Sequence, residues 1–345
     1  MDVQKILTDA AAKVGPSGQE MEVAEYFAEQ FRPFVDEVTV DSMFNVIAHK
    51  KGTGPKVALF AHMDEIGLMV VAIEEDGSLR LGNVGGVDPR ILPACRVWVH
   101  GKEKLFGTIG ALPPHLMKAE DQKQNYRRED LYVDVGLPAE KVRELVRVGD
   151  IVTFNVPSTP LLNGQFAAKT MDDRACVTML VETAERLRKL QCDADVYFVG
   201  STQEEVGSRG AKTAAYALDP DLAIAIDVDH ATIPGSRPNT TVDLDSLCAS
   251  IGPFLQPKLL KRLMDCAAAH HVKLQTTVAE RNTYTDGDDV ALARAGVPVV
   301  LLSLPLKYMH TTVETLDIQA LKEGSRLLSH FLSELDAGWE DDLWI

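Results

Sequence analysis

The sequence has few cysteines, and their arrangement excludes two classes of small-domain scaffold. Five cysteines are scattered over 345 residues, and no two of them form a CxxC pair. An odd number of scattered cysteines argues against a disulfide framework, and the missing CxxC pairs argue against a zinc ribbon. We therefore expect free thiols, most of them buried.

Long apolar runs and an excess of basic residues are also absent. No stretch approaches the roughly 18 apolar residues of a membrane helix. The first twenty residues lack the basic flank and apolar block of a signal peptide. With 35 basic and 51 acidic residues the formal charge is -16, and such a surface repels nucleic acid and anionic lipid. We expect a cytoplasmic protein with no nucleic-acid partner and no membrane partner.

Two textures are present along the chain. Residues 70–160 hold short β-type runs and glycines, interrupted by one helical piece, PAEKVRELV, which favours a small barrel or sandwich. Residues 1–69 and 161–345 alternate apolar strands with amphipathic helices, as is typical of a sheet covered by helices. The sequence therefore predicts an α/β fold, a mixed central sheet sandwiched by helices, with a β-rich domain inserted at 70–160.

Four apolar segments of the flanking regions are predicted strands that lead to a histidine or a carboxylate. They cover residues 56–62, 195–202, 222–228 and 297–304, and they lead to His62, Glu205, Asp227 and His310. Open α/β sheets bind ligands at the carboxyl ends of their strands. Charged groups at the end of a buried strand need a partner or a metal ion. Helices are predicted over residues 173–190, 257–271 and 315–335.

His62 and Asp64 are separated by one residue, so on a strand both side chains point to the same face. This spacing suits a metal-bound imidazole whose second nitrogen faces a carboxylate. An exposed turn with incidental polar residues would give the same pattern.

Two pairs of adjacent carboxylates stand next to predicted strands or helices. Asp172 and Asp173 precede a helical pattern, where an aspartate is also a common helix cap. Glu204 and Glu205 follow an apolar strand, and they repel each other unless cations are near. One could bind metal while the other holds the attacking water. The alternative is a solvated helix start.

His310 stands in the segment KYMHTTVETL, before a helical pattern that Thr311 or Thr312 could cap. A lone histidine here is more often structural than a ligand. Taken with the other strand-end residues, it completes a mixed nitrogen and oxygen donor set. Such a set suits zinc, cobalt or manganese and argues against a thiolate site.

Four motifs, AHMDEIG, MDDR, QEEVG and YMHT, resemble those of the tetrahedral (TET) aminopeptidases. These dinuclear metallopeptidases include glutamyl and deblocking aminopeptidases, and the resemblance extends through nearly the whole chain in the family order. It implies a zinc-exopeptidase-like fold with a PDZ-like insert used for dimerisation. It also implies release of N-terminal residues from short peptides, and self-association of dimers into a dodecamer.

The resemblance also implies a division of labour at a site with two divalent metal ions, zinc or cobalt or else manganese. One ion is bound by His62 and Asp227 and the other by Glu205 and His310, while Asp172 bridges both ions. The peptide bond between Asp172 and Asp173 is expected to be cis. Asp64 orients His62, and Glu204 is the general base.

The chain departs from the family pattern at Asp229, where the family often has a small or hydroxyl residue, and at Ile233, where it often has an acidic one. Neither position is a ligand, so both bear on the substrate pocket. A preference for acidic N-terminal residues would need a basic group such as Lys307, Arg281 or Arg237. An aliphatic preference is equally allowed.

Two other functions fit part of the pattern. In a glycoside hydrolase such as an endoglucanase, Glu204 and Asp64 could act as acid and nucleophile. That chemistry needs no histidines, and an aromatic content of 6% offers little for stacking on sugars. A non-catalytic peptide-binding assembly protein would have no need of Glu204 together with a full ligand set.

Overall fold

The computed structural model describes residues 1–120, 123–237, 240–335 and 338–339, and its chain forms two compact units. The first unit consists of Met1–Asp64, Ser158–Met309 and Val313–Ile345, and the second of Glu65–Pro157 with His310–Thr312. Within the described residues, no helix has the length and apolar character needed to cross a membrane.

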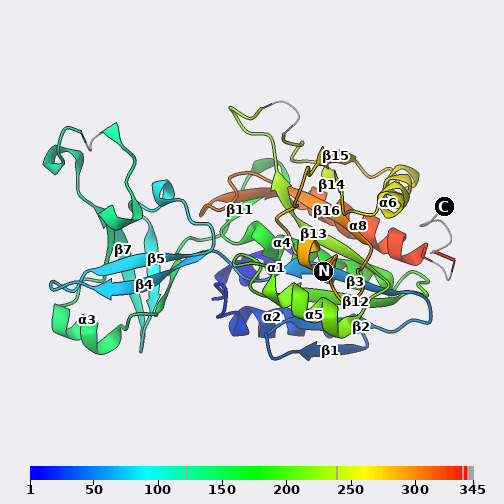
Figure 1. Ribbon diagram of the computed structural model, residues 1–345, viewed down its shortest axis with the longest axis horizontal. Coiled ribbons are helices and arrows are strands. Elements are labelled where there is room, and N and C mark those ends of the chain that lie inside the picture. Colours follow the sequence, from blue (N-terminus) through cyan, green and yellow to red (C-terminus); the bar gives the residue numbers. More distant parts are fainter. Residues whose placement is uncertain (121–122, 238–239, 336–337, 340–345) are drawn as a thin grey trace. The chain divides into compact units, whose positions relative to one another are not determined.

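An eight-stranded mixed sheet forms the centre of the first unit (Figure 1). Its order is β1-β2-β12-β3-β13-β16-β14-β15, and β12, β3, β13 and β16 run parallel to their neighbours in this central group. The bounds are β1 Glu37–Val40, β2 Val46–Lys50, β3 Lys56–His62, β12 Asp195–Ser201, β13 Leu222–His230, β14 Leu247–Ile251, β15 Leu274–Val278 and β16 Val299–Leu306. The four strands predicted from apolar runs are confirmed as β3, β12, β13 and β16.

Helices cover both faces of this sheet. Alternate residues of a strand point to opposite sides, and in the buried strands the residues on both sides are apolar, so both faces need to be covered. Leu59 of β3 joins the core formed with the first group of helices, whereas Phe60 joins the core on the other face. The first group contains α1 Val3–Ala12, α2 Met21–Phe31, α4 Met171–Leu187, α6 Pro257–Ala269 and α8 Ile318–Ser333, and the second contains α5 Arg209–Leu218 and α7 Gly287–Val290.

A small sheet of three strands precedes the last helix. It has the order β10-β11-β17, with bounds Thr159–Pro160, Gln165–Ala168 and Glu314–Asp317. The helix predicted over residues 315–335 is therefore wrong at its start. Residues 314–317 pair with β11, and Asp317 then caps α8 by accepting from the backbone N–H groups of Gln319 and Ala320 at 2.7 and 3.1 Å. The proposed cap at Thr311 or Thr312 is wrong for the same reason.

The second unit is a closed barrel of six antiparallel strands in the order β4-β5-β8-β7-β6-β9. Its strands are β4 Gly67–Ile73, β5 Leu79–Val84, β6 Arg96–His100, β7 Lys104–Ala111, β8 Leu131–Asp134 and β9 Ile151–Phe154, and helix α3 covers Ala139–Leu145. Inward-facing residues such as Leu68, Leu79, Val99 and Val133 fill the barrel. The predicted α/β fold with a mixed, helix-covered sheet and an inserted small β-barrel is confirmed.

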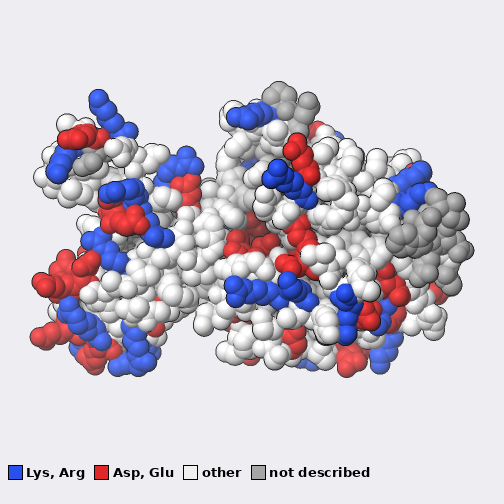
Figure 2. All heavy atoms as spheres, in the orientation of Figure 1, with Lys and Arg blue, Asp and Glu red and all other residues white. Residues whose placement is uncertain are grey.

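The negative net charge is not gathered into one patch on the face drawn in Figure 2. Basic and acidic side chains are intermixed over the surface of both units there. The cysteines are free, as predicted, and Cys176, Cys248 and Cys266 are buried.

Candidate metal centre

The carboxyl ends of β3, β12 and β13 meet at one edge of the central sheet and bring a histidine and several carboxylates together. His62 is the last residue of β3, and Ser201, at the end of β12, is its partner in the parallel register. Asp227 lies near the end of β13, which pairs with β3 on its other side. Parallel pairing thus gathers groups that are more than a hundred residues apart in sequence.

His62 is surrounded by carboxylates and is only 2% exposed. Its Nε2 lies 3.0 Å from Asp172 Oδ1 and 3.9 Å from Glu204 Oε2, and its Nδ1 lies 3.3 Å from Asp64 Oδ1. The Asp64 contact is within ion-pair distance, although its angles do not complete a hydrogen bond. Burial alone would lower the pKa of His62, but Asp172, Asp64 and Glu204 outweigh it and raise that pKa well above its usual range.

Asp64 is fully buried and holds the two glutamates that follow β12. Its carboxylate accepts from the backbone N–H groups of Glu204 at 3.0 Å and Glu205 at 3.2 Å, and from the hydroxyl of Ser17 at 2.6 Å. Burial would raise the pKa of Asp64, but His62 and these donors lower it instead. An ionised Asp64 therefore fixes the turn that presents Glu204 and Glu205.

The Asp172–Asp173 pair enters the site from the first turn of α4, and the peptide bond between the two residues is cis. The backbone N–H of Asp172 donates to Glu314 Oε2 at 3.1 Å. Asp173 Oδ2 accepts from the backbone N–H of His62 at 3.3 Å, whereas Asp173 Oδ1 is buried without a hydrogen bond. Burial, with a smaller contribution from Asp172, raises the pKa of Asp173 well above its usual range.

Asp227 and Glu204 are under similar electrostatic strain. Burial, with Asp173 and Asp172 nearby, raises the pKa of Asp227 well above its usual range. Burial also raises the pKa of Glu204 to about 10, and Asp227, Asp286 and Glu205 add to that rise against the opposing effect of His62. Carboxyl groups in such a cluster stay neutral in the absence of cations and become ionised when cations are close.

These residues fit divalent metal ions by both geometry and chemistry. Donor atoms of His62, Asp172 and Glu205 all lie within 4.8 Å of one another, as do those of His62, Asp173 and Asp227. All of these donors are nitrogen or oxygen, which suits zinc, cobalt or manganese. The oxygen of Asp173 that has no hydrogen bond and the raised carboxyl pKa values indicate that the described residues supply too little positive charge to ionise the whole cluster, a charge that bound cations would add.

The structure thus brings together six of the seven residues that the sequence singled out, namely His62, Asp64, Asp172, Glu204, Glu205 and Asp227. The seventh, His310, belongs to the second unit with Thr311 and Thr312. It has a left-handed backbone, with φ of 59°, and its ring fills the space beside Gly86. Its role as a metal ligand stays a prediction.

Several residues around the site were missed or undervalued in the sequence. Asp173 joins the donor group, although its neighbour Asp172 was the predicted ligand. Glu20, fully buried, accepts from the backbone N–H of Gln203 at 3.1 Å, and Asp286 accepts from the hydroxyl of Ser201. The thiol of Cys176 donates to the carbonyl of Asp227 at 3.4 Å. None of them follows an apolar strand directly, so strand-end reasoning could not find them.

A comparison of family models and a comparison of individual proteins both match this chain to aminopeptidases. A family model described as M42 glutamyl aminopeptidase matches residues 45–327. The lysyl aminopeptidase of Pyrococcus furiosus is 37% identical over 327 residues, which cover 93% of this chain and 94% of the relative.

Solved structures agree in fold over almost the whole chain. A TET aminopeptidase from a marine sediment Thaumarchaeota archaeon superposes with a TM-score of 0.94 at 28% identity, covering 99% of this chain and 98% of that chain. The TET1 peptidase of Pyrococcus horikoshii, described as able to assemble into a tetrahedron or a large octahedral shell, has a TM-score of 0.84 at 30% identity, covering 97% and 100%.

Proposed function

The chain belongs to the M42 glutamyl aminopeptidase family, and from this premise we propose that it removes N-terminal residues from short peptides with two divalent metal ions and Glu204 as general base. The chain is an aminopeptidase, a hydrolase that acts on peptide bonds. The observation that carries the metal proposal is the largely buried cluster of one histidine and six carboxylates at one sheet edge.

The residues available to hold the ions divide into two sets. We assign His62 and Asp227 to one ion and Glu205 and His310 to the other, with Asp172 shared between them. The close donor groups around His62 support the first set and part of the second. When bound, the two ions would polarise the scissile carbonyl and lower the pKa of the attacking water.

Glu204 is the residue placed to move the proton. Its carboxylate lies 3.9 Å from His62 Nε2, and its backbone is fixed by the bond to Asp64. An ionised Glu204 would accept a proton from the attacking water and deliver it to the leaving amine nitrogen, as general acid–base catalysis requires. Asp64 acts through its neighbours, because it orients His62 and the Glu204–Glu205 turn.

The finer properties of the enzyme follow the same proposal. We propose zinc or cobalt, with manganese as a further choice, because the donors are imidazole and carboxylate. The five free thiols support a reducing compartment such as the cytoplasm.

Self-association is proposed on the basis of the related shell-forming peptidase. We propose dimers that build a dodecamer, with residues 70–160 as the inserted PDZ-like dimerisation domain and residues 1–69 and 161–345 as the catalytic domain.

The glycoside-hydrolase alternative is not favoured, since the family model and the lysyl relative are peptidases. The non-catalytic alternative is disfavoured by the retention of Glu204 within the full donor cluster.

Metal removal tests the proposed function directly. The full-length protein is stripped with a chelator, reloaded with zinc, cobalt or manganese, and assayed on leucyl-, lysyl- and glutamyl-anilides while the bound metal is counted. We expect loss of hydrolysis on stripping, recovery on reloading and two ions per chain. Hydrolysis that survives complete metal removal, or cleavage of a β-glucan without cleavage of any anilide, would contradict the proposal.

A further inference from the structure

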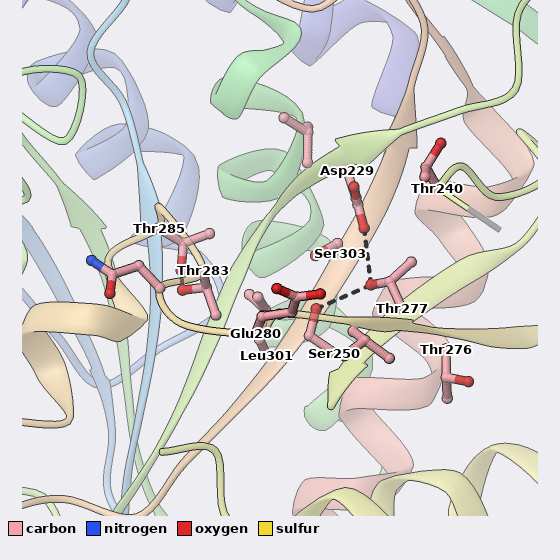
Figure 3. Close-up of a pocket in the computed structure, with 14 residues that line it drawn as sticks. Asp229, Thr240, Ser250, Thr276, Thr277, Glu280, Thr283, Thr285, Leu301 and Ser303 are labelled. Atoms are coloured by element: carbon pink, nitrogen blue, oxygen red, sulfur yellow. Dashed lines mark hydrogen bonds between the residues drawn. The ribbon is translucent and has the colours of Figure 1, made fainter. Parts of the chain in front are cut away.

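A cavity of about 570 Å³ lies in the first unit, within the size range of small-molecule sites (Figure 3). Its walls come from the end of β13, from the interior of β16, from β14 and β15, from Thr240, and from the loop over residues 279–285. Every one of these elements belongs to the same compact unit as the candidate metal centre.

Two residues of the cavity wall adjoin Asp227, a donor of the metal centre, in the central sheet. Asp229, which lines it, follows Asp227 by two residues on β13, so both side chains leave the same face of the sheet. Ser303 also lines the cavity and is the register partner of Asp227 on β16. Thr285 of the cavity wall directly precedes Asp286, which accepts from Ser201 just ahead of the Glu204 turn. A group held in this cavity is therefore close to the proposed site of hydrolysis.

The charge of the cavity is of one sign. Asp229 and Glu280 line it, and none of the described lining residues is Lys, Arg or His. The basic residues that an acidic substrate would need, Arg237, Arg281 and Lys307, are not among the described residues of its wall.

Asp229 is held in place as a carboxylate acceptor. Its Oδ1 accepts from the backbone N–H of His230 at 2.7 Å, and its Oδ2 accepts from the hydroxyl of Thr277 at 3.2 Å and from the thiol of Cys248 at 3.6 Å. Figure 3 shows the Asp229–Thr277 bond continuing to Ser250. These donors fix the carboxylate on the cavity wall.

The rest of the wall suits a long side chain that ends in a cation. The hydroxyls of Ser250 and Ser303 offer further acceptors, and an ammonium group has three hydrogens to donate. Leu301 and Val278 offer apolar surface for a methylene stem.

We propose that this cavity receives the side chain of the substrate's N-terminal residue and selects lysine or arginine, with Asp229 and Glu280 as the specificity residues. The proposal rests on the proposed aminopeptidase function and adds the substrate class. It also gives a role to Asp229, which departs from the family pattern in sequence.

Matched substrates test the selection on the metal-loaded enzyme. Norleucine has the same straight stem as lysine but no terminal ammonium, so lysyl-, arginyl-, norleucyl- and glutamyl-anilides isolate the contribution of the charge. We expect kcat/KM to be about tenfold or more higher for lysyl than for norleucyl substrate, because hydrogen bonds to charged groups are worth more than neutral ones. Glutamyl substrate should be the poorest.

Carboxamide variants assign the effect to the cavity. Asp229→Asn and Glu280→Gln should each lower the lysyl-to-norleucyl ratio of kcat/KM by several-fold, and the double variant by about tenfold. Glu280→Lys should shift the ratio toward glutamyl substrate. Asp265→Asn is the matched control, because it removes one exposed carboxylate that pairs with Lys261 outside the cavity.

The outcomes separate this proposal from the function on which it rests. If the enzyme prefers norleucyl or glutamyl substrate over lysyl substrate, and Asp229→Asn leaves the ratios of kcat/KM unchanged, the pocket does not select cationic side chains. The proposed aminopeptidase function would still stand. An equal loss on all substrates in Asp229→Asn would assign that carboxylate to the α-amino group and overturn the side-chain proposal. Faster cleavage of the dipeptide Ala-Lys than of Lys-Ala would show that the pocket receives the residue after the scissile bond rather than the N-terminal residue, and would overturn the proposal. No cleavage of any substrate contradicts the proposed function itself.

Discussion

The two compact units bury very different chemistry. In the first unit, Asp64, Asp172, Asp173 and Asp227 are each 6% exposed or less at the edge of the central sheet. In the described barrel strands of the second unit, the buried side chains are apolar apart from Thr153, whose hydroxyl lies 2.8 Å from His100 Nε2. Buried carboxylates cost stability unless something compensates them. The buried carboxylates of the first unit are therefore best explained by function, whereas the apolar core of the barrel in the second unit contributes to stability.

A similar contrast exists between two carboxylates within the first unit. Asp64 receives three hydrogen bonds and its pKa is lowered, whereas burial and neighbouring carboxylates raise the pKa of Glu204 to about 10. Environments that push the pKa values of neighbouring acids apart are how active sites divide roles between them. Here the division separates a fixed positioning residue from a group that can exchange a proton.

The largest expected effect comes from Glu204→Gln. Turnover should fall by about a thousandfold, because loss of a general base typically costs two to four orders of magnitude. The variant should keep its bound metal, measured by elemental analysis beside kcat. Glu205→Gln is the matched comparison and should lose metal, because Glu205 belongs to a donor group. Activity near that of the wild type in Glu204→Gln would remove it as the base.

A cavity in the barrel should affect stability without affecting the metal. Leu79 is fully buried and is the register partner of Val133 on the neighbouring strand β8. Leu79→Ala should lower the free energy of unfolding by about 2–5 kcal/mol, measured by urea denaturation with intrinsic tryptophan fluorescence. Val71→Ala is the control, since Val71 is 50% exposed on the neighbouring strand. The contrast between the units would be contradicted if folded Leu79→Ala lost its metal, or if Leu79→Ala and Val71→Ala had equal free energies of unfolding.

The smallest effect is a pH dependence that comes from Glu20. Burial raises the pKa of Glu20 to about 7, with Asp64 adding to the rise. The folded state therefore keeps a proton that the unfolded state has already lost, so this contribution to stability is full below about pH 4.5 and declines as the pH rises through about 7.

Glu20→Gln should remove that decline. Between pH 5 and pH 8, the metal-free wild type should lose roughly 1–3 kcal/mol of unfolding free energy relative to Glu20→Gln. Glu25→Gln, at an exposed position on helix α2, which Glu20 directly precedes, should follow the wild type. Parallel stability curves for wild type and Glu20→Gln, measured by urea titration at each pH, would show that Glu20 is not buried as an acid.

Local patterns in the sequence were enough to predict much of the fold. The runs KVALFAH and LAIAIDV are continuous and apolar, and they are strands β3 and β13. Their continuous burial and the polar residues at their ends followed from the run of letters alone. The start of α8 was misplaced because residues 314–317 form a segment too short for its apolar pattern to distinguish a strand from a helix. They are a strand because they pair with β11.

The sequence by itself singled out candidates for a metal site. His62, Asp172, Glu204, Glu205 and Asp227 each stand at the boundary of an element that their neighbours in sequence define. Only the tertiary structure decided how these groups interact. Asp64 bonds to residues about 140 positions away, and Glu20 reaches Gln203. The acidic cavity of Asp229 and Glu280 likewise arises from separate strands and a loop. Such contacts depend on how parallel strands align in the sheet, and electrostatic effects such as the pKa of Glu204 depend on distance in space rather than along the chain.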